Sequence, residues 1–426
     1  MLHAHYADNS CAGEWWDDDH VVRRFVCDLI VAELAHLRPS GVTLPALPWG
    51  DGCSISLDLG ADSLELLGLA SALAEAVHLH ESGIEDYLLT RTTVGDWIAV
   101  VRAGLRQFSS ALTFRTSGTG GQPKSCSHLL ADLWQETLEL AAILPRRSRI
   151  LSAVPSHHIY GFLFTILLPR AMQLNGASVT DLRGSTPVHL ARDLREGDLV
   201  IAHPEYWRAV SRFVPAIVPG VTGVTSTAPC ADEVSNAVCR IGLDRLLQIY
   251  GSSETAGVGW RDSAANNYRL FSHWHRSMSD ANELIRVTSE SRHTLFRCQD
   301  VLAWSDENHF LPTGRIDDVV QVGGINVAPT KVRAVLLRHP DVLEASVRLM
   351  HADEGNRLKA FVVPCSSAPG HEVLHQRLEQ WVSAHLTPAE RPKAFTFGAH
   401  LPVGPTGKDA DWQILGTGTV IQPNMI

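Results

Sequence analysis

Residues 113–124 read TFRTSGTGGQPK, and this stretch decides the class of fold. Six of the nine residues from Thr116 to Lys124 are Thr, Ser or Gly. Small hydroxyl residues and glycines let backbone N–H groups turn toward an anion, and glycine supplies the positive φ angles that this requires. A strand-like run, 111–114, precedes the loop, and a run with helical spacing follows Ser127, a candidate N-cap. A strand, a hydroxyl-rich loop and a helix together favour a phosphate site.

This loop differs from a Walker loop, because Pro123 rather than Gly stands before Lys124. The competing interpretation is a flexible surface linker, since Gly-rich runs match phosphate motifs by chance. The loop alone does not decide between the two.

Composition bounds the class of protein. The 426 residues carry a net charge of −10 and are 45% hydrophobic, which predicts several globular domains and no broad footprint for nucleic acid. The eight Cys form no CxxC pair and read as reduced thiols. The N-terminus is acidic, with no Lys or Arg before Arg23, which is opposite to a signal peptide. No apolar run reaches the length of a membrane span, so a soluble cytoplasmic protein is expected.

The first quarter of the chain predicts helices. Residues 1–18 form an acidic leader, and residues 19–105 are expected to form a small four-helix bundle. Apolar residues from Val22 to Leu37 mark one helix, and Asp62 with Glu65 reads as the capping box of the next. Thr93 is the expected cap of the last helix. The hydroxyl of Ser63, at the start of the second long helix, is ordinarily a second capping group.

From Ala111 onward, strand-like and helix-like runs alternate, as in an α/β domain. The run Leu246–Tyr250 is a buried type of strand that leads directly into GSSET, residues 251–255. Ligands sit at the carboxyl ends of strands in open α/β sheets. Glu254 there is a candidate Mg²⁺ ligand, although a solvated turn residue is the commoner fate of such a Glu. His158, in SHHIYGF at residues 156–162, follows another strand; a packed core histidine is the alternative.

Five motifs in this order resemble the acyl-adenylating, AMP-binding superfamily of acyl- and aryl-CoA or carrier-protein ligases. They are TSGTGGQPK, HIYGF, IYGSSET, GRIDDVVQVGGINVAP and LPVGPTGK, and they span roughly residues 111–410. The resemblance implies an adenylation core over 111–314, truncated at its N-terminal side, and a small mobile α+β domain over 315–426. The segment GGINVAP is most similar to benzoate- and coumarate-type ligases, which points to an aromatic acid.

The same resemblance implies a two-step reaction and a role for each matching residue. A carboxylate attacks the α-phosphate of ATP to give acyl-AMP and pyrophosphate, and a thiol then displaces AMP. The implied ATP-phosphate contacts are Thr116, Ser117, Gly118, Thr119 and Lys124, with Glu254 on Mg²⁺ and Thr255 on the α-phosphate. Tyr250, Gly251 and Ser252 would border the adenine, Asp300 would bind the ribose hydroxyls, and Arg315 would assist at the ribose or at the phosphate. Lys408 would bridge carboxylate and α-phosphate, and His158 would lie where acyl group and thiol meet.

The bundle carries a second resemblance, because LGADSLELLGLASALAE is similar to the acyl carrier protein motif. It implies a phosphopantetheine arm on Ser63. The leading hypothesis is therefore a ligase that loads a small carboxylic acid onto a carrier thiol. Two alternatives stay open: an acyl- or aryl-CoA ligase with a vestigial carrier fold, and a non-catalytic scaffold. The usual long N-terminal α/β segment of the superfamily is absent before the phosphate loop, which motivates the scaffold.

Overall fold

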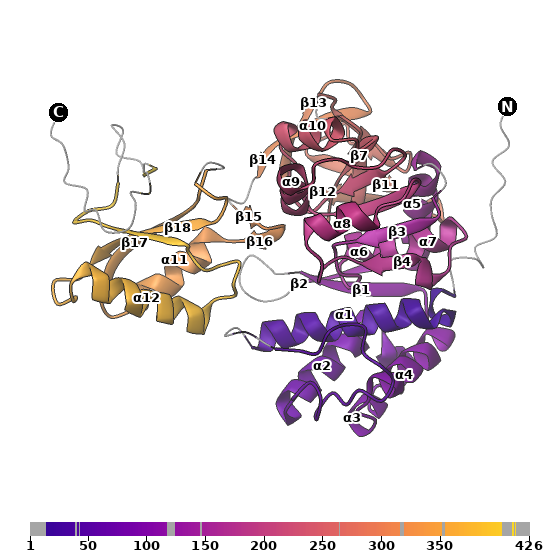
Figure 1. Cartoon of the computed structure of the whole chain (residues 1–426), viewed down its shortest axis with the longest axis horizontal. Coiled ribbons are helices and arrows are strands. Elements are labelled where there is room, and N and C mark those ends of the chain that lie inside the picture. Colours follow the sequence, from indigo (N-terminus) through magenta and orange to yellow (C-terminus); the bar gives the residue numbers. More distant parts are fainter. Residues whose placement is uncertain are drawn as a thin grey trace. The chain divides into compact units, whose positions relative to one another are not determined.

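The computed structural model describes residues 14–38, 41, 43–116, 124–144, 147–263, 265–315, 319–351, 354–402, 411–412 and 414, with the backbone alone at 116 and 315. These residues divide into two compact units (Figure 1). The larger unit takes the described parts of 1–34, 43–116 and 124–316, and the smaller one the described parts of 35–42 and 317–426. No helix in these ranges is both long and apolar enough to cross a membrane.

A nine-stranded mixed sheet organises the larger unit, in the order β13-β14-β9-β8-β7-β6-β5-β3-β4. Strands β3, β4, β5, β6 and β7 are parallel, and β7, β8, β9, β14 and β13 continue the sheet antiparallel. The parallel strands are Arg149–Ser152, Val179–Asp181, Asp198–Ala202, Thr222–Thr225 and Arg245–Ser252, for β3 to β7. The others are β8 Ala256–Arg261, β9 Tyr268–Leu270, β13 Asp300–Trp304 and β14 His309–Arg315. The parallel strands therefore present their carboxyl ends at one edge, the edge where such sheets bind ligands.

Helices cover the sheet because each presents an apolar stripe. A core of buried side chains, including Val200, Trp207 and Val238, joins the sheet to three helices. These helices are α8 Pro187–Asp193, α9 Pro204–Phe213 and α10 Asp232–Arg240. Between β2 and β4 the chain forms several helical segments. They are α5 Leu130–Ile143, α6 Ile159–Phe162, the π-helix Leu163–Leu167, α7 Leu168–Ala171 and a 3₁₀ turn at Gly176–Ser178. A further three-stranded sheet comprises β10 Trp274–Arg276, β11 Glu283–Val287 and β12 His293–Arg297.

The predicted N-terminal helices are present: α1 Asp19–Leu37, α2 Ser63–Ala76, α3 Tyr87–Thr90 and α4 Val94–Gln107, with short 3₁₀ turns at Trp15–Asp17 and Leu79–Glu81. The capping box of Asp62 and Glu65 is confirmed, and so is the cap at Thr93. However, these helices belong to the larger unit, except for the last three residues of α1 (Figure 1). The separate carrier-like bundle over 19–105 is therefore not supported.

Contacts across this supposed boundary give the physical reason. Arg24 of α1 donates to the carbonyl oxygens of Thr165, Gly176 and Val179 at 2.8–3.2 Å. Trp15 packs edge-on against Phe162 of α6, with ring centroids 5.3 Å apart. A carrier domain would present its own closed core, whereas α1 is a buried wall of the α/β unit.

A two-stranded hairpin, β1 Ala111–Thr116 and β2 Lys124–Leu129, brackets the phosphate loop. Ser127 was expected to cap the following helix, and that expectation is wrong. Strand β2 continues to Leu129 and α5 begins at Leu130, while the Ser127 hydroxyl pairs with Thr113 Oγ1 at 2.7 Å across the hairpin.

The smaller unit is built on the antiparallel pair β17 Val342–Leu349 and β18 Leu358–Pro364, with β19 Ala394–Phe397 parallel to β18. Helices α11 Pro329–Leu337 and α12 His371–His385 share its apolar core (Figure 1). A hairpin of β15 Val320–Val322 and β16 Ile325–Val327 precedes α11. Its turn, Gly323-Gly324, takes φ of 59° and 82°, which explains the two glycines.

Candidate functional site

Strand pairing fixes both ends of the phosphate loop. Thr116 and Lys124 face each other as the last register pair of β1 and β2. The predicted ligands Ser117, Gly118 and Thr119 lie outside the described residues, as does the side chain of Thr116. The hairpin therefore fixes the backbone position of Lys124 at the start of β2.

Lys124 meets Glu254, which is 130 residues away in sequence. Lys124 Nζ lies 2.8 Å from Glu254 Oε1, with the two side chains 54% and 35% exposed. The hydrogen bond raises the pKa of Lys124. Burial acts to raise the pKa of Glu254, but the hydrogen bonds from Lys124, its own backbone N–H and Ser252, together with the charge of Lys124, outweigh it and hold that pKa below its usual value. At neutral pH the pair is thus a cation and a carboxylate side by side, both reachable from solvent.

The turn after β7 is fixed by its own hydrogen bonds. Ser252 N donates to Thr255 Oγ1 at 3.0 Å, and Glu254 N donates to Ser252 Oγ at 3.2 Å. The Thr255 hydroxyl donates to the carbonyl oxygen of Ala256 at 2.9 Å, and Ala256 has φ of 58°, unusual for a residue with a side chain. A Cβ on Gly251 would lie 2.1 Å from that same oxygen. Glycine is therefore required at 251, and the turn holds Glu254 in place.

Tyr250 and Asp300 also come together. The Tyr250 hydroxyl donates to Asp300 Oδ2 at 2.8 Å, and the Tyr250 ring packs edge-on against Phe310 at 5.2 Å. Asp300 begins β13 and faces Arg315 of β14 in register. The side chain of Arg315 lies outside the described residues.

His158 follows β3 at the carboxyl edge of the sheet, where it precedes α6. Its ring centroid lies 4.1 Å from that of His157. The protein around His158 desolvates the imidazole and lowers its pKa to about 4, although the side chain retains solvent access. The residue is therefore a neutral imidazole at neutral pH, and it is not the packed core histidine of the alternative interpretation.

Asp28 of α1 binds the segment that leads to His158. No sequence motif predicted this role. Its Oδ2 accepts from Ser156 N at 2.6 Å and Ser156 Oγ at 2.7 Å, while Oδ1 accepts from Arg183 at 2.6 Å. Asp28 is 2% exposed and Ser156 is fully buried. A charged residue between the apolar Cys27 and Leu29 was the signal available in the sequence.

The structure does not bring the other two predicted residues, Ser63 and Lys408, to the residues described above. Ser63 is exposed at the first turn of α2 beside the capping Asp62. Lys408 lies outside the described residues. Within the described ranges, no group of three or more His, Cys, Asp or Glu side chains is arranged to hold a metal ion.

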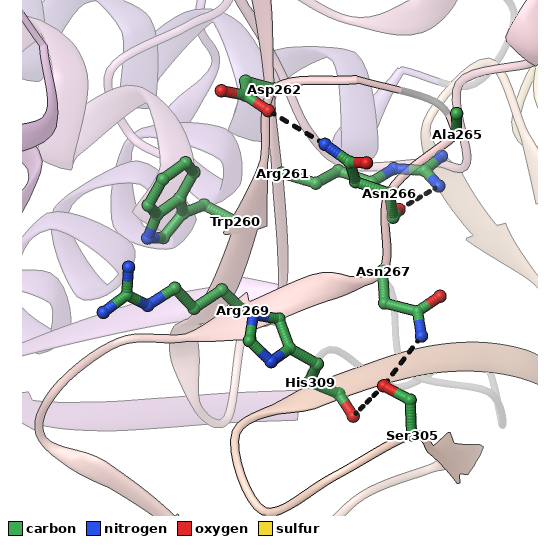
Figure 2. Close-up of a pocket in the computed structure, with 9 residues that line it drawn as sticks. All are labelled: Trp260, Arg261, Asp262, Ala265, Asn266, Asn267, Arg269, Ser305 and His309. Atoms are coloured by element: carbon green, nitrogen blue, oxygen red, sulfur yellow. Dashed lines mark hydrogen bonds between the residues drawn. The ribbon is translucent and has the colours of Figure 1, made fainter.

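A polar cavity of about 450 Å³ lies elsewhere in the larger unit (Figure 2). Its lining includes Arg269 of β9. It also includes Trp260 and His309, at the ends of β8 and β14 that point away from Thr255 and Arg315. None of the predicted site residues that the structure describes lines it.

Comparison with known proteins gives matches over both parts of the chain. Residues 331–408 match the family model of the AMP-binding enzyme C-terminal domain. A protein from Halorhodospira halophila named 4-coumarate–CoA ligase is 39% identical over 395 residues, which cover 91% of this chain and 97% of that protein. One of the same name from Rhodobacter capsulatus is 35% identical over 402 residues, covering 92% and 100%. A third, from Cereibacter sphaeroides, is 36% identical over 363 residues, covering 83% and 84%.

Solved structures agree on the fold. The amide bond synthetase McbA from Marinactinospora thermotolerans superposes with a TM-score of 0.59 at 18% identity, covering 91% of this chain and 92% of that one. A malonyl-CoA ligase complex reaches a TM-score of 0.57 at 20% identity, covering 68% and 71%. The adenylate-forming α/β large domain with a small C-terminal domain is thereby confirmed, and neither comparison supports a carrier domain or a phosphopantetheine arm.

Proposed function

Because the chain belongs to the AMP-forming acid–thiol ligases that resemble 4-coumarate–CoA ligase, we propose that it activates an aromatic carboxylic acid with ATP and transfers the acyl group to CoA. The first step joins the carboxylate oxygen to the α-phosphate and releases pyrophosphate. In the second step the thiol sulfur attacks the acyl carbon, AMP leaves, and the thiol proton goes to solvent.

One observation carries the chemistry, namely the contact between Lys124 and Glu254. Like charges oppose the attack of a carboxylate on a phosphate, so the site must supply positive charge where negative charge gathers. Lys124 supplies it as a compact ammonium at the strand end beside the phosphate loop, where Thr116, Ser117, Gly118 and Thr119 would add donors. Mg²⁺ is commonly held by one or two carboxylates together with substrate phosphates, and Glu254 fits that donor set.

The neighbouring residues take roles consistent with their geometry. Tyr250, Gly251 and Ser252 would border the adenine. Asp300, whose carboxylate accepts a hydrogen bond from the Tyr250 hydroxyl, would bind the ribose. Thr255 would contact the α-phosphate only after its hydroxyl leaves the bond to the Ala256 carbonyl. Arg315 and Lys408 would add positive charge near the ribose or phosphate and the reacting carboxylate. His158, neutral at pH 7, would stand beside the acyl group as the thiol arrives.

CoA replaces a carrier protein as the proposed acceptor. The relatives that match along nearly their whole length are named CoA ligases. Their alignments cover 91% and 92% of this chain, so most of residues 19–105 must lie inside the aligned region. The N-terminal helices that resemble a carrier protein are thus largely shared with such ligases. The same sharing weakens the argument that a short N-terminal region marks a non-catalytic scaffold.

The test is acid-dependent exchange of labelled pyrophosphate into ATP, with a panel of 4-coumarate, benzoate and a fatty acid. We expect exchange with an aryl acid and, after CoA is added, an acyl-CoA product. Lys408→Ala should remove the exchange while leaving the unfolding midpoint unchanged. A folded protein that exchanges with no acid would sink the proposal in favour of the scaffold, and exchange followed by no thioester with CoA would remove the acceptor.

A further inference from the structure

A fully buried carboxyl lies directly behind the turn that carries Glu254 and Thr255. Glu136, on α5, is 0% exposed. Its Oε1 accepts from the backbone N–H of Gly257 at 3.0 Å. Its Oε2 is buried and has no hydrogen-bond partner among the described residues. Burying a carboxyl inside a domain is costly, so the position calls for an explanation.

The backbone at this point is shaped around the carboxyl. A Cβ on Gly257 would lie 2.3 Å from Glu136 Oε1, so a side chain at residue 257 would displace the carboxyl. The carbonyl oxygen of Gly257 accepts from Trp274 Nε1 at 2.8 Å. Gly257 is thus held through its N–H by α5 and through its oxygen by β10, two residues after Thr255.

A buried arginine holds the other end of the same segment. Arg286 of β11 is 3% exposed, and it donates to the carbonyl oxygen of Thr255 at 3.3 Å and to that of Asp132 at 2.7 Å. Asp132 and Glu136 both lie on α5, which begins where β2 ends. Strand β2 carries Lys124 at its first position. A continuous set of contacts therefore joins the lysine's strand to the turn of Glu254 and Thr255.

Burial, rather than the charges nearby, keeps Glu136 neutral at pH 7. Burial raises the pKa of Glu136 to about 8, and the opposing attraction of Arg286 is smaller. Glu139, the other acid near it, adds a small repulsion and is itself bonded to Ser272 and His273. An ionised carboxylate at this depth would repel phosphate oxygens bound on the far side of the turn.

We infer that Glu136 is a positioning residue: it holds the backbone of Thr255–Gly257 in the form that presents Glu254 and Thr255 to the phosphates of Mg·ATP. The inference rests on the proposed function for the identity of that ligand. A merely structural role would change the stability of the fold and leave nucleotide affinity, and its dependence on pH, as they are.

The experiment measures the dissociation constant of Mg·ATP by calorimetry from pH 6.5 to 9, on the full chain and three variants. Glu136→Leu removes the acceptor of the Gly257 N–H, and Glu136→Gln keeps it without the charge. Glu139→Gln, one helical turn away on the same helix, is the matched control. Urea unfolding of each variant reports the fold separately.

We expect Glu136→Leu to weaken Mg·ATP binding roughly 10-fold, the equivalent of one lost hydrogen bond. Glu136→Gln should bind within about 3-fold of the wild type at pH 7. Wild-type affinity should fall as pH rises past about 8, where Glu136 ionises, and that fall should be absent in Glu136→Gln. Glu139→Gln should retain the wild-type profile.

Two results would overturn the inference. One is a folded Glu136→Leu with wild-type affinity. The other, which decides the matter even if that variant fails to fold, is an alkaline fall in Glu136→Gln equal to that of the wild type. Wild-type protein that bound Mg·ATP without acid-dependent exchange would remove the ligase proposal and leave this inference intact. Wild-type protein that bound no Mg·ATP would remove both.

Discussion

Replacing Asp28 with Ala should destabilise the larger unit by about 3 kcal/mol, because it leaves buried donors without an acceptor. Two of the three hydrogen bonds of Asp28 come from Ser156, which is fully buried and finds no water in exchange. An unmet buried donor costs about 1–3 kcal/mol. The third bond, from Arg183, adds less, since that side chain is 27% exposed and keeps its bonds to Asp181.

The assay is equilibrium urea unfolding of the full chain, followed by tryptophan fluorescence. A loss of about 3 kcal/mol would be a large share of the roughly 5–15 kcal/mol by which a domain is stable. The matched control is Asp181→Ala, which breaks an ion pair to the same arginine. Because the Asp181 side chain is 41% exposed, this change should cost less than about 1 kcal/mol.

The reasoning fails if Asp28→Ala shifts the midpoint no further than Asp181→Ala does. It also fails if Asp28→Ala produces a separate early transition while the main one stays in place. That second pattern is what an independent bundle over residues 19–105 would give, since only its own core would be weakened.

Further predictions concern the turn, the ion pair, the buried carboxyl and the serine. Lys124→Ala should lower kcat/KM for exchange about 100-fold, from loss of one electrostatic donor, with at most about 1 kcal/mol of stability lost; Lys331→Ala, from an ion pair in the smaller unit, is the control. Gly251→Ala should cost about 1–3 kcal/mol and most of the exchange, whereas Gly314→Ala, with open space around it, should cost neither. The folded-state pKa of Glu136 is raised to about 8. The contribution of Glu136 to the free energy of unfolding is therefore complete below its unfolded pKa of about 4.5 and is lost as pH rises toward 8. Glu136→Gln should therefore gain stability over the wild type between pH 5 and pH 8, by about 3 kcal/mol at pH 7, in urea titrations; equal slopes for both proteins would refute this. Ser63→Ala should leave exchange and thioester yield unchanged, and a phosphopantetheinyl transferase should add no mass to the wild type.

Local chemistry was readable from the sequence. The capping box of Asp62 and the cap at Thr93 each depend on residues within one helical turn, and both are found. The same locality explains the error about the carrier. A capped helix with leucines on one face looks alike in a carrier and in a ligase. What separates them is where Glu75 goes, and it bonds to Arg115 and Ser125 of the hairpin, forty to fifty residues on.

The candidate site was predicted through motifs rather than through geometry. The resemblance named both Lys124 and Glu254, and the structure brings them to 2.8 Å. Asp28 and Glu136 belong to no quoted motif and were missed. Asp28 interrupts an apolar helical run, which signals a buried partner but does not say which one, because the partner is fixed only when distant segments pack. Glu136 stands between Gln135 and Thr137 and carries no such signal.

The contacts of α1 and of the turn before it join residues that the ribosome makes at different times. Asp28 is joined to Arg183, 155 residues later in the chain, and Trp15 packs on Phe162. At about 5–20 residues per second, the ribosome needs on the order of 10–30 s between making the helix and making its last partner. For that time these contacts cannot form, and apolar surface that stays exposed in an incomplete chain is what chaperones bind. Substitutions on this face should therefore reduce how much protein a cell accumulates before they reduce what each finished molecule can do.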